Sequence, residues 1–224
     1  MKWALVLVGS PGSGKGTQSR LLTQWLGIPQ VSTGDMLREE MQRDSGLGRS
    51  VAELMRSGKL VSDELVNLMV VDRISRPDCA KGFILDGYPR TIAQADKVGG
   101  LIAKAGAGEV VIHLVVDYNE IISRMSGRRV CPVCGTLYNA IYCPSVVEGM
   151  CDLDGARLDV RDDDREDVVR ARLAEYDKQT APLVEYFRAS GRHLLEVRAS
   201  GRTPEEIFSQ IRGGLESLAE VKVA

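Results

Sequence analysis

Short runs of apolar residues alternate along the chain with longer segments whose apolar residues recur at helical intervals. The runs Trp3 to Val8, Gly82 to Leu85, Val110 to Val116 and His193 to Val197 each predict a strand. Strands that are apolar on both faces and separated by helices are typical of a parallel sheet with helices on both sides. The pattern therefore predicts an α/β fold with a doubly wound parallel sheet.

Helices are expected between and after these strands. The helical spacing covers residues 14–26, 91–105 and 118–125, then about 163 to 190, and finally 203–218. The last two begin at Asp163-Asp164-Arg165-Glu166 and Thr203-Pro204-Glu205-Glu206, which resemble capping boxes.

Two segments interrupt the alternation of strands and helices. Residues 33–74 are helical almost throughout, with stops at Ser45-Gly46 and Ser57-Gly58-Lys59, whereas residues 129–163 lose the helical pattern and are rich in Cys, Pro, Gly, Tyr and Asp. The second composition suits a small insertion that needs a covalent or metal link. The expected division is a core of residues 1–32, 62–128 and 165–224, a helical subdomain of residues 33–61 and an inserted lid of residues 129–164.

Composition excludes several classes of protein. The chain has 224 residues, of which 44% are hydrophobic and 27% charged, so it is long and apolar enough to bury a core. Its 29 Lys and Arg against 31 Asp and Glu give a net charge of −2, which speaks against a protein that coats nucleic acid or anionic lipid. The longest apolar run, Trp3 to Val8, is far short of the ~20 residues that span a membrane. With no signal-peptide pattern, we expect a cytoplasmic protein.

A phosphate-binding loop follows the first predicted strand. Gly9-Ser10-Pro11-Gly12-Ser13-Gly14-Lys15 satisfies the pattern G-x-x-x-x-G-K between a buried strand and a helix. Its backbone N–H groups and Lys15 are suited to phosphate; the alternative is a tight turn with a solvated lysine. Gly16 stands where the motif usually has a hydroxyl, and Thr17 comes one place later. We therefore expect Mg²⁺ to be held by phosphates and water, with Asp86 as an outer partner unless it only caps the following turn.

Paired cysteines predict a metal site in the insertion. Cys131 and Cys134 have C-x₂-C spacing, and Cys151 with Asp154 repeats this spacing with an aspartate in the last place. Three thiolates and a carboxylate close a tetrahedral structural zinc site, although iron or cobalt also fits. Cys143 is a rival fourth ligand, and Cys79 is most simply a core residue.

Four separated motifs, in this order, resemble the adenylate kinase family in its long form with a metal-bearing lid. They are Gly-Ser-Pro-Gly-Ser-Gly-Lys-Gly-Thr-Gln (9–18), Ser-Thr-Gly-Asp-Met-Leu-Arg (32–38), Leu-Asp-Gly-Tyr-Pro-Arg-Thr (85–91) and Gly-Arg-Arg-Val-Cys (127–131). The resemblance runs from residue 2 to roughly 200. It implies phosphoryl transfer from Mg-ATP to AMP by a monomer.

The resemblance also implies the nucleotide contacts. The implied AMP-binding residues are Thr33, Arg38, Lys59, Leu60, Val61, Gly87, Tyr88, Pro89, Arg90, Gln94, Arg161 and Arg172. The implied ATP-binding residues are Gly12, Ser13, Gly14, Lys15, Gly16, Thr17, Arg128, Leu137 and Tyr138. Taken alone, Gln94 and Thr33 could instead cap helices, and Arg38 could lie on a solvated helix face. Asn139 departs from the histidine common in the family at its position.

Catalysis by such an enzyme depends on alignment and positive charge more than on covalent chemistry. The residues expected to carry it are Lys15, Asp86, Arg90, Arg124, Arg128, Arg161 and Arg172. Asp163 and Asp164 follow Arg161 as the family's lid pair does, and either could also cap the next helix. No general base is required, and the histidines, His113 and His193, fall inside predicted strands.

Three other functions compete with this interpretation. A UMP or CMP kinase would use the same chemistry, but those enzymes usually have a short lid. A nucleotide-hydrolysing switch needs a water-positioning residue, for which the sequence offers no candidate. A zinc-ribbon nucleic-acid binder should have a basic insertion, yet acidic residues outnumber basic ones between Cys131 and Asp164.

Overall fold

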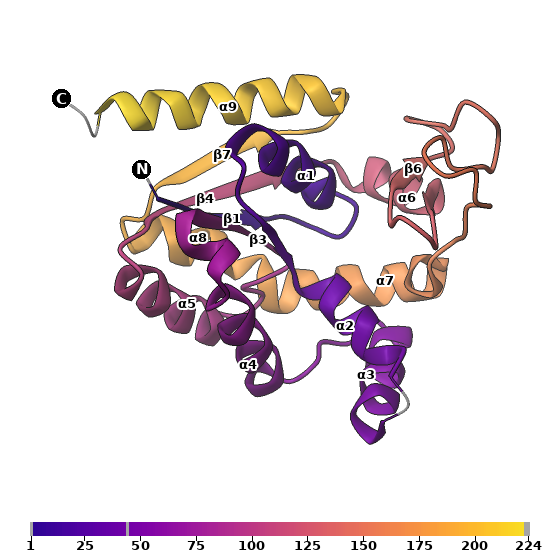
Figure 1. Cartoon of the computed structure of the whole chain (residues 1–224), viewed down its shortest axis with the longest axis horizontal. Helices are drawn as coiled ribbons and strands as arrows, with labels where there is room; N and C mark the ends of the chain where they lie inside the picture. The colour runs from indigo at the N-terminus through magenta and orange to yellow at the C-terminus, as the bar shows by residue number, and fades with distance from the viewer. Residues whose placement is uncertain (1, 44, 222–224) are drawn as a thin grey trace.

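The computed structural model describes residues 2–43 and 45–221, and a parallel sheet lies at its centre (Figure 1). Its strands are β1 (Trp3–Val8), β2 (Gln30–Ser32), β3 (Gly82–Asp86), β4 (Gly108–Val115) and β7 (Leu194–Arg198), in the order β2-β3-β1-β4-β7. Each neighbouring pair is parallel. The expected doubly wound sheet is confirmed, with β2 as an additional short strand at one edge.

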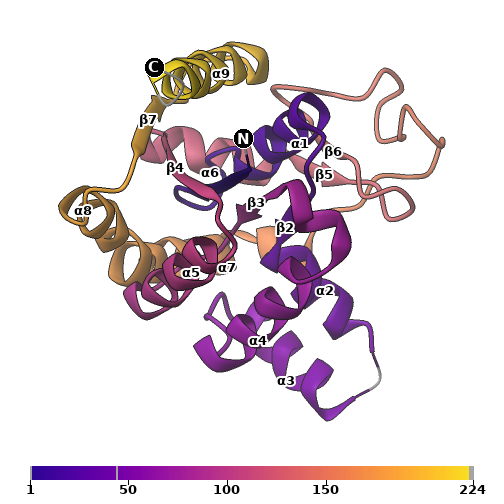
Figure 2. The same ribbon diagram turned by 60° about the vertical axis from the view of Figure 1, so that its left-hand side comes forward.

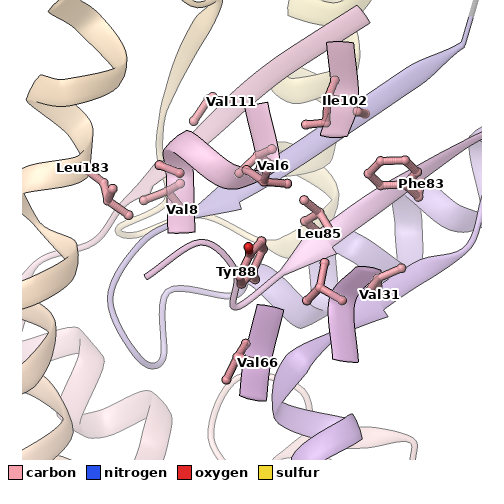
Figure 3. Close-up of a cluster of buried hydrophobic side chains, with 14 of the residues drawn as sticks. Val6, Val8, Val31, Val66, Phe83, Leu85, Tyr88, Ile102, Val111 and Leu183 are labelled. Atoms are coloured by element: carbon pink, nitrogen blue, oxygen red, sulfur yellow. The ribbon is translucent and has the colours of Figure 1, made fainter. Parts of the chain in front are cut away.

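Helices cover both faces of this sheet. The α-helices of the described residues are α1 (Lys15–Leu26), α2 (Thr33–Met41), α3 (Gly46–Arg56), α4 (Asp63–Ile74), α5 (Ile92–Lys104), α6 (Tyr118–Ser126), α7 (Glu166–Glu175), α8 (Pro182–Ala189) and α9 (Pro204–Val221). Leu5 and Leu7 of β1 pack with α1 and α9, whereas Val6 and Val8 pack with the cluster that includes α4, α5 and α8. Figure 3 shows part of this second cluster, including Tyr88. In the described residues, no helix has the length and hydrophobicity to cross a bilayer.

The segment after β2 consists of the three helices α2, α3 and α4, which lie together at one end of the molecule (Figure 2). Each begins at a serine whose hydroxyl accepts a backbone N–H: Ser32 from Asp35, Ser45 from Gly48 and Ser62 from Leu65. The predicted stops around residues 45 and 57 are therefore real helix boundaries.

The segment between α6 and α7 contains strands but no long helix. Strands β5 (Arg128–Val130) and β6 (Leu137–Asn139) form an antiparallel pair, and the following loop returns to pair Asp159 with Val130. This inserted segment extends beyond α6 and α7 at one side of the molecule (Figure 1).

The helix expected from about residue 163 to 190 is wrong as one element. Residues Asp162–Asp164 form a 3₁₀ turn, α7 begins at Glu166 without a side-chain cap, and a π-helical turn at Tyr176–Thr180 separates α7 from α8. The capping box expected at Asp163 is therefore also wrong, because arginine side chains engage that carboxylate instead. The second capping box does form: Thr203 N–H donates to Glu206 Oε2 (2.8 Å) and Glu206 N–H to Thr203 Oγ1 (3.2 Å).

Candidate active site

The loop between β1 and α1 has a backbone that only glycine adopts easily. Gly12 and Gly14 have φ values of 78° and 96°. A Cβ on Gly12 would lie 2.9 Å from Cγ of Met125 in α6, so a side chain there would also collide with a neighbouring helix. Gly14 is the N-cap of α1. A glycine-rich loop that ends in a helix N-terminus is well suited to bind phosphate.

The partly buried Lys15 and the buried Asp86 lie beside this loop. Lys15 Nζ donates to the carbonyl oxygens of Gly9 (2.7 Å) and Ser10 (2.8 Å). Burial lowers the pKa of Lys15 to about 7, although the Asp86 carboxylate acts in the opposite direction. Asp86 Oδ2 accepts from Gln30 Nε2 (2.9 Å), and burial raises the pKa of this carboxyl above its ordinary value. Each of the two groups influences the pKa of the other, and both lie where a bound phosphate would be close to them.

A cleft of about 990 Å³ opens from the loop and extends between α2 and the inserted segment. It is at the upper end of the range for a small-molecule site. The sequence-predicted residues that line it are Gly12, Gly14, Lys15, Gly16, Thr17, Thr33, Arg38, Lys59, Leu60, Val61, Asp86, Gly87, Pro89, Arg90, Gln94, Arg124, Arg128, Leu137, Tyr138, Arg161 and Arg172.

Two candidates do not present their side chains to this cleft. Ser13 is fully buried, and its hydroxyl accepts from Lys15 Nζ at 3.3 Å. Tyr88 is 1% exposed within the core (Figure 3), where its hydroxyl donates to Asn67 Oδ1 at 2.5 Å. Any contact of Tyr88 with a ligand must therefore come from its main chain.

Several arginines meet at the centre of the cleft. Burial, together with neighbouring guanidinium groups, lowers the pKa of Arg90 and that of Arg161 to about 10. The pKa of Arg128 is also lowered by burial, with Asp164 acting against the shift. These shifts reflect mainly the loss of water around the guanidinium groups, and an anion bound among them would stabilise their charged forms.

Two aspartates partly compensate this charge. Asp163 lies 2.8 Å from Arg172 Nη1 and 3.8 Å from Arg38 Nη1. Although burial acts to raise it, the pKa of Asp163 is held below its ordinary value by these arginines. Asp164 lies 3.4 Å from both Arg128 Nε and Arg172 Nη1, but burial dominates and raises its pKa. The pair thus connects arginines of α2, β5 and α7.

Arg124 is held in a fixed orientation at another part of the cleft. Glu120 Oε1 accepts from Arg124 Nε (3.0 Å) and Nη2 (2.7 Å), and Nη2 also donates to the Ala199 carbonyl (2.7 Å). The second oxygen of Glu120 accepts from Gly201 N–H (3.1 Å). Glu120 therefore links α6 to the loop before α9.

Side chains from α2, α5 and the inserted segment meet at the remaining part of the cleft. Thr33 Oγ1 donates to the Gly87 carbonyl (2.8 Å), so it ties α2 to the loop after β3; the N-cap of α2 is Ser32 and not Thr33. Arg38 Nη2 donates to Asp35 Oδ1 at 2.6 Å, and Arg161 Nη2 lies 3.9 Å from the same atom.

Within the inserted segment, Tyr138 and Asn139 have structural contacts. The Tyr138 hydroxyl accepts from Asp152 N–H (2.8 Å), and the residue is 8% exposed. Asn139 Nδ2 donates to the Arg124 carbonyl (2.8 Å), while its Oδ1 accepts from Ile141 N–H (2.9 Å). Asn139 thus fastens the segment to α6.

The predicted metal ligands Cys131, Cys134, Cys151 and Asp154 are grouped in space. Their ligand atoms all lie within 4.8 Å of one another, with Cys134 Sγ 3.6 Å from Cys151 Sγ and Cys131 Sγ 3.3 Å from Asp154 Oδ2. A tetrahedral zinc site with bonds of about 2.3 Å separates its ligands by about 3.8 Å, so the cluster fits such an ion. Within the described residues, Cys143 lies outside this group and Cys79 is buried in the core.

The histidines are not among the residues that line the cleft. His113 Nδ1 lies 3.3 Å from Glu196 Oε1, and burial lowers the pKa of His113. His193 directly precedes β7.

Comparison with known proteins agrees with this geometry. Residues 7–192 match the family described as Adenylate kinase. The chain belongs to the adenylate kinase family. The adenylate kinase of Anaeromyxobacter sp. (strain Fw109-5) is 48% identical over 206 residues, which cover 92% of this chain and 95% of that protein. The adenylate kinase of Thermosipho melanesiensis is 47% identical over 189 residues (84% and 88%), and that of Fervidobacterium nodosum 44% over 214 residues (95% and 98%).

Adenylate kinase motifs did not reveal several residues around the cleft. Arg20 of α1, Arg202 before α9 and Pro204 at the start of α9 line it, and Glu120 positions Arg124. One signal was available for the loop before α9: the predicted last strand and helix place it at the carboxyl edge of the sheet, where open α/β folds bind ligands. Glu120 had only its i, i+4 spacing to Arg124 as a signal.

Proposed function

We propose that the chain catalyses the reversible transfer of a phosphoryl group from Mg-ATP to AMP, which yields two ADP molecules. The observation that carries this proposal is the single cleft in which the phosphate-loop lysine Lys15 lies among Arg90, Arg128, Arg161 and Arg172. Two phosphate-rich ligands brought together need such a concentration of cations, whereas one nucleotide that is hydrolysed by water does not.

In this proposal the donor occupies the phosphate loop. The loop from Gly12 to Thr17 holds the β- and γ-phosphates, Arg124 and Arg128 lie over the donor, and Leu137 and Tyr138 border the base. The carboxylate and hydroxyl oxygens of Asp86 and Thr17 suit Mg²⁺, which prefers oxygen ligands and keeps several waters. When bound with ATP, this ion supplies charge that neutralises the transferred phosphoryl group. Asp86 would hold it through water.

The acceptor lies beside α2 and the loop after β3. Arg38 and Arg90 grip the AMP phosphate, Thr33, Gly87 to Pro89 and residues 59–61 surround the nucleoside, and Gln94 contacts the base. Arg161 and Arg172 reach the transferred group from the other side. This arrangement aligns an AMP phosphate oxygen with the γ-phosphorus while the bond to the β,γ-bridging oxygen breaks. The acceptor phosphate is ionised near neutral pH, so no general base is needed.

The inserted segment acts as a lid with a structural metal, most simply Zn²⁺, bound by Cys131, Cys134, Cys151 and Asp154. Four protein ligands leave no open position, so this metal stabilises and does not catalyse. We assign residues 129–164 to the lid, 33–61 to the AMP-binding subdomain, and 1–32, 62–128 and 165–224 to the core. We further expect a cytoplasmic monomer that binds neither nucleic acid nor membranes, and light scattering of the purified protein tests its oligomeric state.

The decisive experiment measures ADP formation from Mg-ATP with AMP, UMP, CMP or GMP as the acceptor, and with ATP alone. Strong turnover with AMP alone supports the proposal. Faster turnover with UMP or CMP would retain the mechanism but replace the acceptor. Turnover that needs ATP only and is not increased by any acceptor would replace the kinase with a hydrolase.

A further inference from the structure

Asp63, the first residue of α4, forms two short hydrogen bonds that join α4 to α5. One of its carboxylate oxygens accepts from Thr91 Oγ1 at 2.6 Å, and the other accepts from Gln94 Nε2 at 2.7 Å. Thr91 is the N-cap of α5, and its hydroxyl also accepts from Gln94 N–H (3.2 Å). No sequence motif pointed to Asp63, because its partners come from a helix about thirty residues later.

The same contacts fix the orientation of the Gln94 side chain. Its Oε1 accepts from Arg90 N–H at 2.7 Å, while its Nε2 faces the carboxylate of Asp63. A backbone N–H can only donate and an ionised carboxylate can only accept, so the two partners determine which end of the amide is oxygen and which is nitrogen. Gln94 is 2% exposed, so water does not replace either partner.

An amide that is oriented in this way keeps one free N–H and one free oxygen lone pair in a fixed order. Adenine presents an exocyclic amino donor beside a ring nitrogen acceptor, whereas a 6-oxopurine presents a carbonyl acceptor beside a ring N–H donor. A 180° rotation of the amide would exchange donor and acceptor and so match the 6-oxo base. In this protein the rotated amide would turn its oxygen toward the Asp63 carboxylate and its NH₂ group toward the Arg90 N–H, and both contacts are repulsive.

We propose that Asp63 is a positioning residue that makes the acceptor site select a 6-aminopurine over a 6-oxopurine, by locking the amide of Gln94. The inference rests on the proposed function, since Gln94 lines the cleft at the end assigned to AMP. Asp63 acts through Gln94 and need not touch the nucleotide.

The test compares AMP with inosine monophosphate, which differs from AMP in the 6-oxo edge that the proposal concerns. The measured quantity is the ratio of kcat/KM for inosine monophosphate to kcat/KM for AMP. Both values come from one preparation, so the ratio does not depend on the fraction of folded protein. The variants Asp63→Ala and Asp63→Leu both lack the carboxylate that accepts the hydrogen bond from Gln94, but their side chains differ in volume. Glu64→Ala is the matched control, because it removes an exposed carboxylate from the same first turn of α4.

We expect the ratio to rise about tenfold or more in both Asp63 variants, which corresponds to a loss of about 1.4 kcal/mol of discrimination. Glu64→Ala should keep the wild-type ratio. A ratio within twofold of wild type in either Asp63 variant, even with a lower melting temperature, would show that Asp63 only joins the helices and would overturn the inference. Absence of AMP turnover in the wild-type protein would instead overturn the proposed function.

Discussion

Lys15 makes the binding of ATP sensitive to pH in a direction that can be worked out from its surroundings. In the free protein, burial lowers the pKa of Lys15 from 10.5 to about 7, and the nearby Arg90, Arg172 and Arg128 add to the shift. Bound phosphates bring negative charge to the ammonium group and so raise its pKa again. Above pH 7, binding should therefore take up a proton.

The size of the effect follows from the two pKa values. The protonated form of Lys15 is the one that binds phosphate well, so affinity is highest below pH 7 and falls as the pH rises above it. Each pH unit above the free-state pKa costs about tenfold in affinity, or roughly 1.4 kcal/mol. Between pH 7 and pH 9 the affinity for ATP should fall on the order of fiftyfold.

Isothermal titration calorimetry at constant free Mg²⁺ measures both quantities. The dissociation constant is determined from pH 7 to pH 9, and the same titration in buffers of different ionisation enthalpy gives the number of protons taken up. At pH 9 this number should approach one per ATP. The terminal phosphate of ATP, with a pKa of about 6 to 7, is ionised over most of this range and contributes little.

Lys15→Met is the control because it has no titratable group at this position. We expect it to fold normally, to bind ATP with little dependence on pH and to lose phosphoryl transfer. A wild-type affinity that is constant between pH 7 and pH 9, without proton uptake, would refute the reasoning, since Lys15 would then be charged in the free protein. Retained transfer activity in Lys15→Met would refute the assignment of the phosphate loop.

Two further predictions concern the lid and the core. Chelation of the lid metal should lower the melting temperature by about 10 °C while the initial rate at 25 °C stays within about twofold, because a closed four-ligand site stabilises without catalysing. Scanning fluorimetry and rate measurements check this. A loss of activity as large as the loss of stability, reversed only when metal is added back, would contradict it. Tyr88→Phe leaves the buried Asn67 oxygen without its donor and should cost about 1 to 3 kcal/mol of stability, measured by urea unfolding. The KM for AMP should stay unchanged. A large increase in that KM at unchanged stability would mean that the Tyr88 side chain contacts AMP.

The sheet was predictable wherever both faces of a strand are buried. Trp3 to Val8 reads as a strand because its residues alternate between two apolar clusters. The edge strand Gln30–Ser32 was missed, since it has a single fully buried residue, Val31, and so carries no apolar run. The π-helical turn before Pro182 divided a helix whose periodicity continued through it. Local patterns therefore located strands that carry an apolar run, including the edge strand β7, and missed the short strand that has none.

Side-chain directions in the cleft could not be read from motifs in the same way. The motif around residue 88 marks a loop that lines the cleft, but only packing determines that the Tyr88 side chain points into the core. Asp163 resembled a helix cap in sequence, but in the structure its carboxylate forms an ion pair with Arg172. Contacts such as Asp63 to Gln94 join segments about thirty residues apart and have no local signature.

The sheet topology also bears on how this enzyme can change over evolutionary time. The helices α2 to α4 lie in the connection between β2 and β3, and the small antiparallel sheet lies in the connection between α6 and α7. Neither connection interrupts one of the five parallel strands. Selection can therefore vary these two segments separately from each other and from the phosphate loop, which lies between β1 and α1.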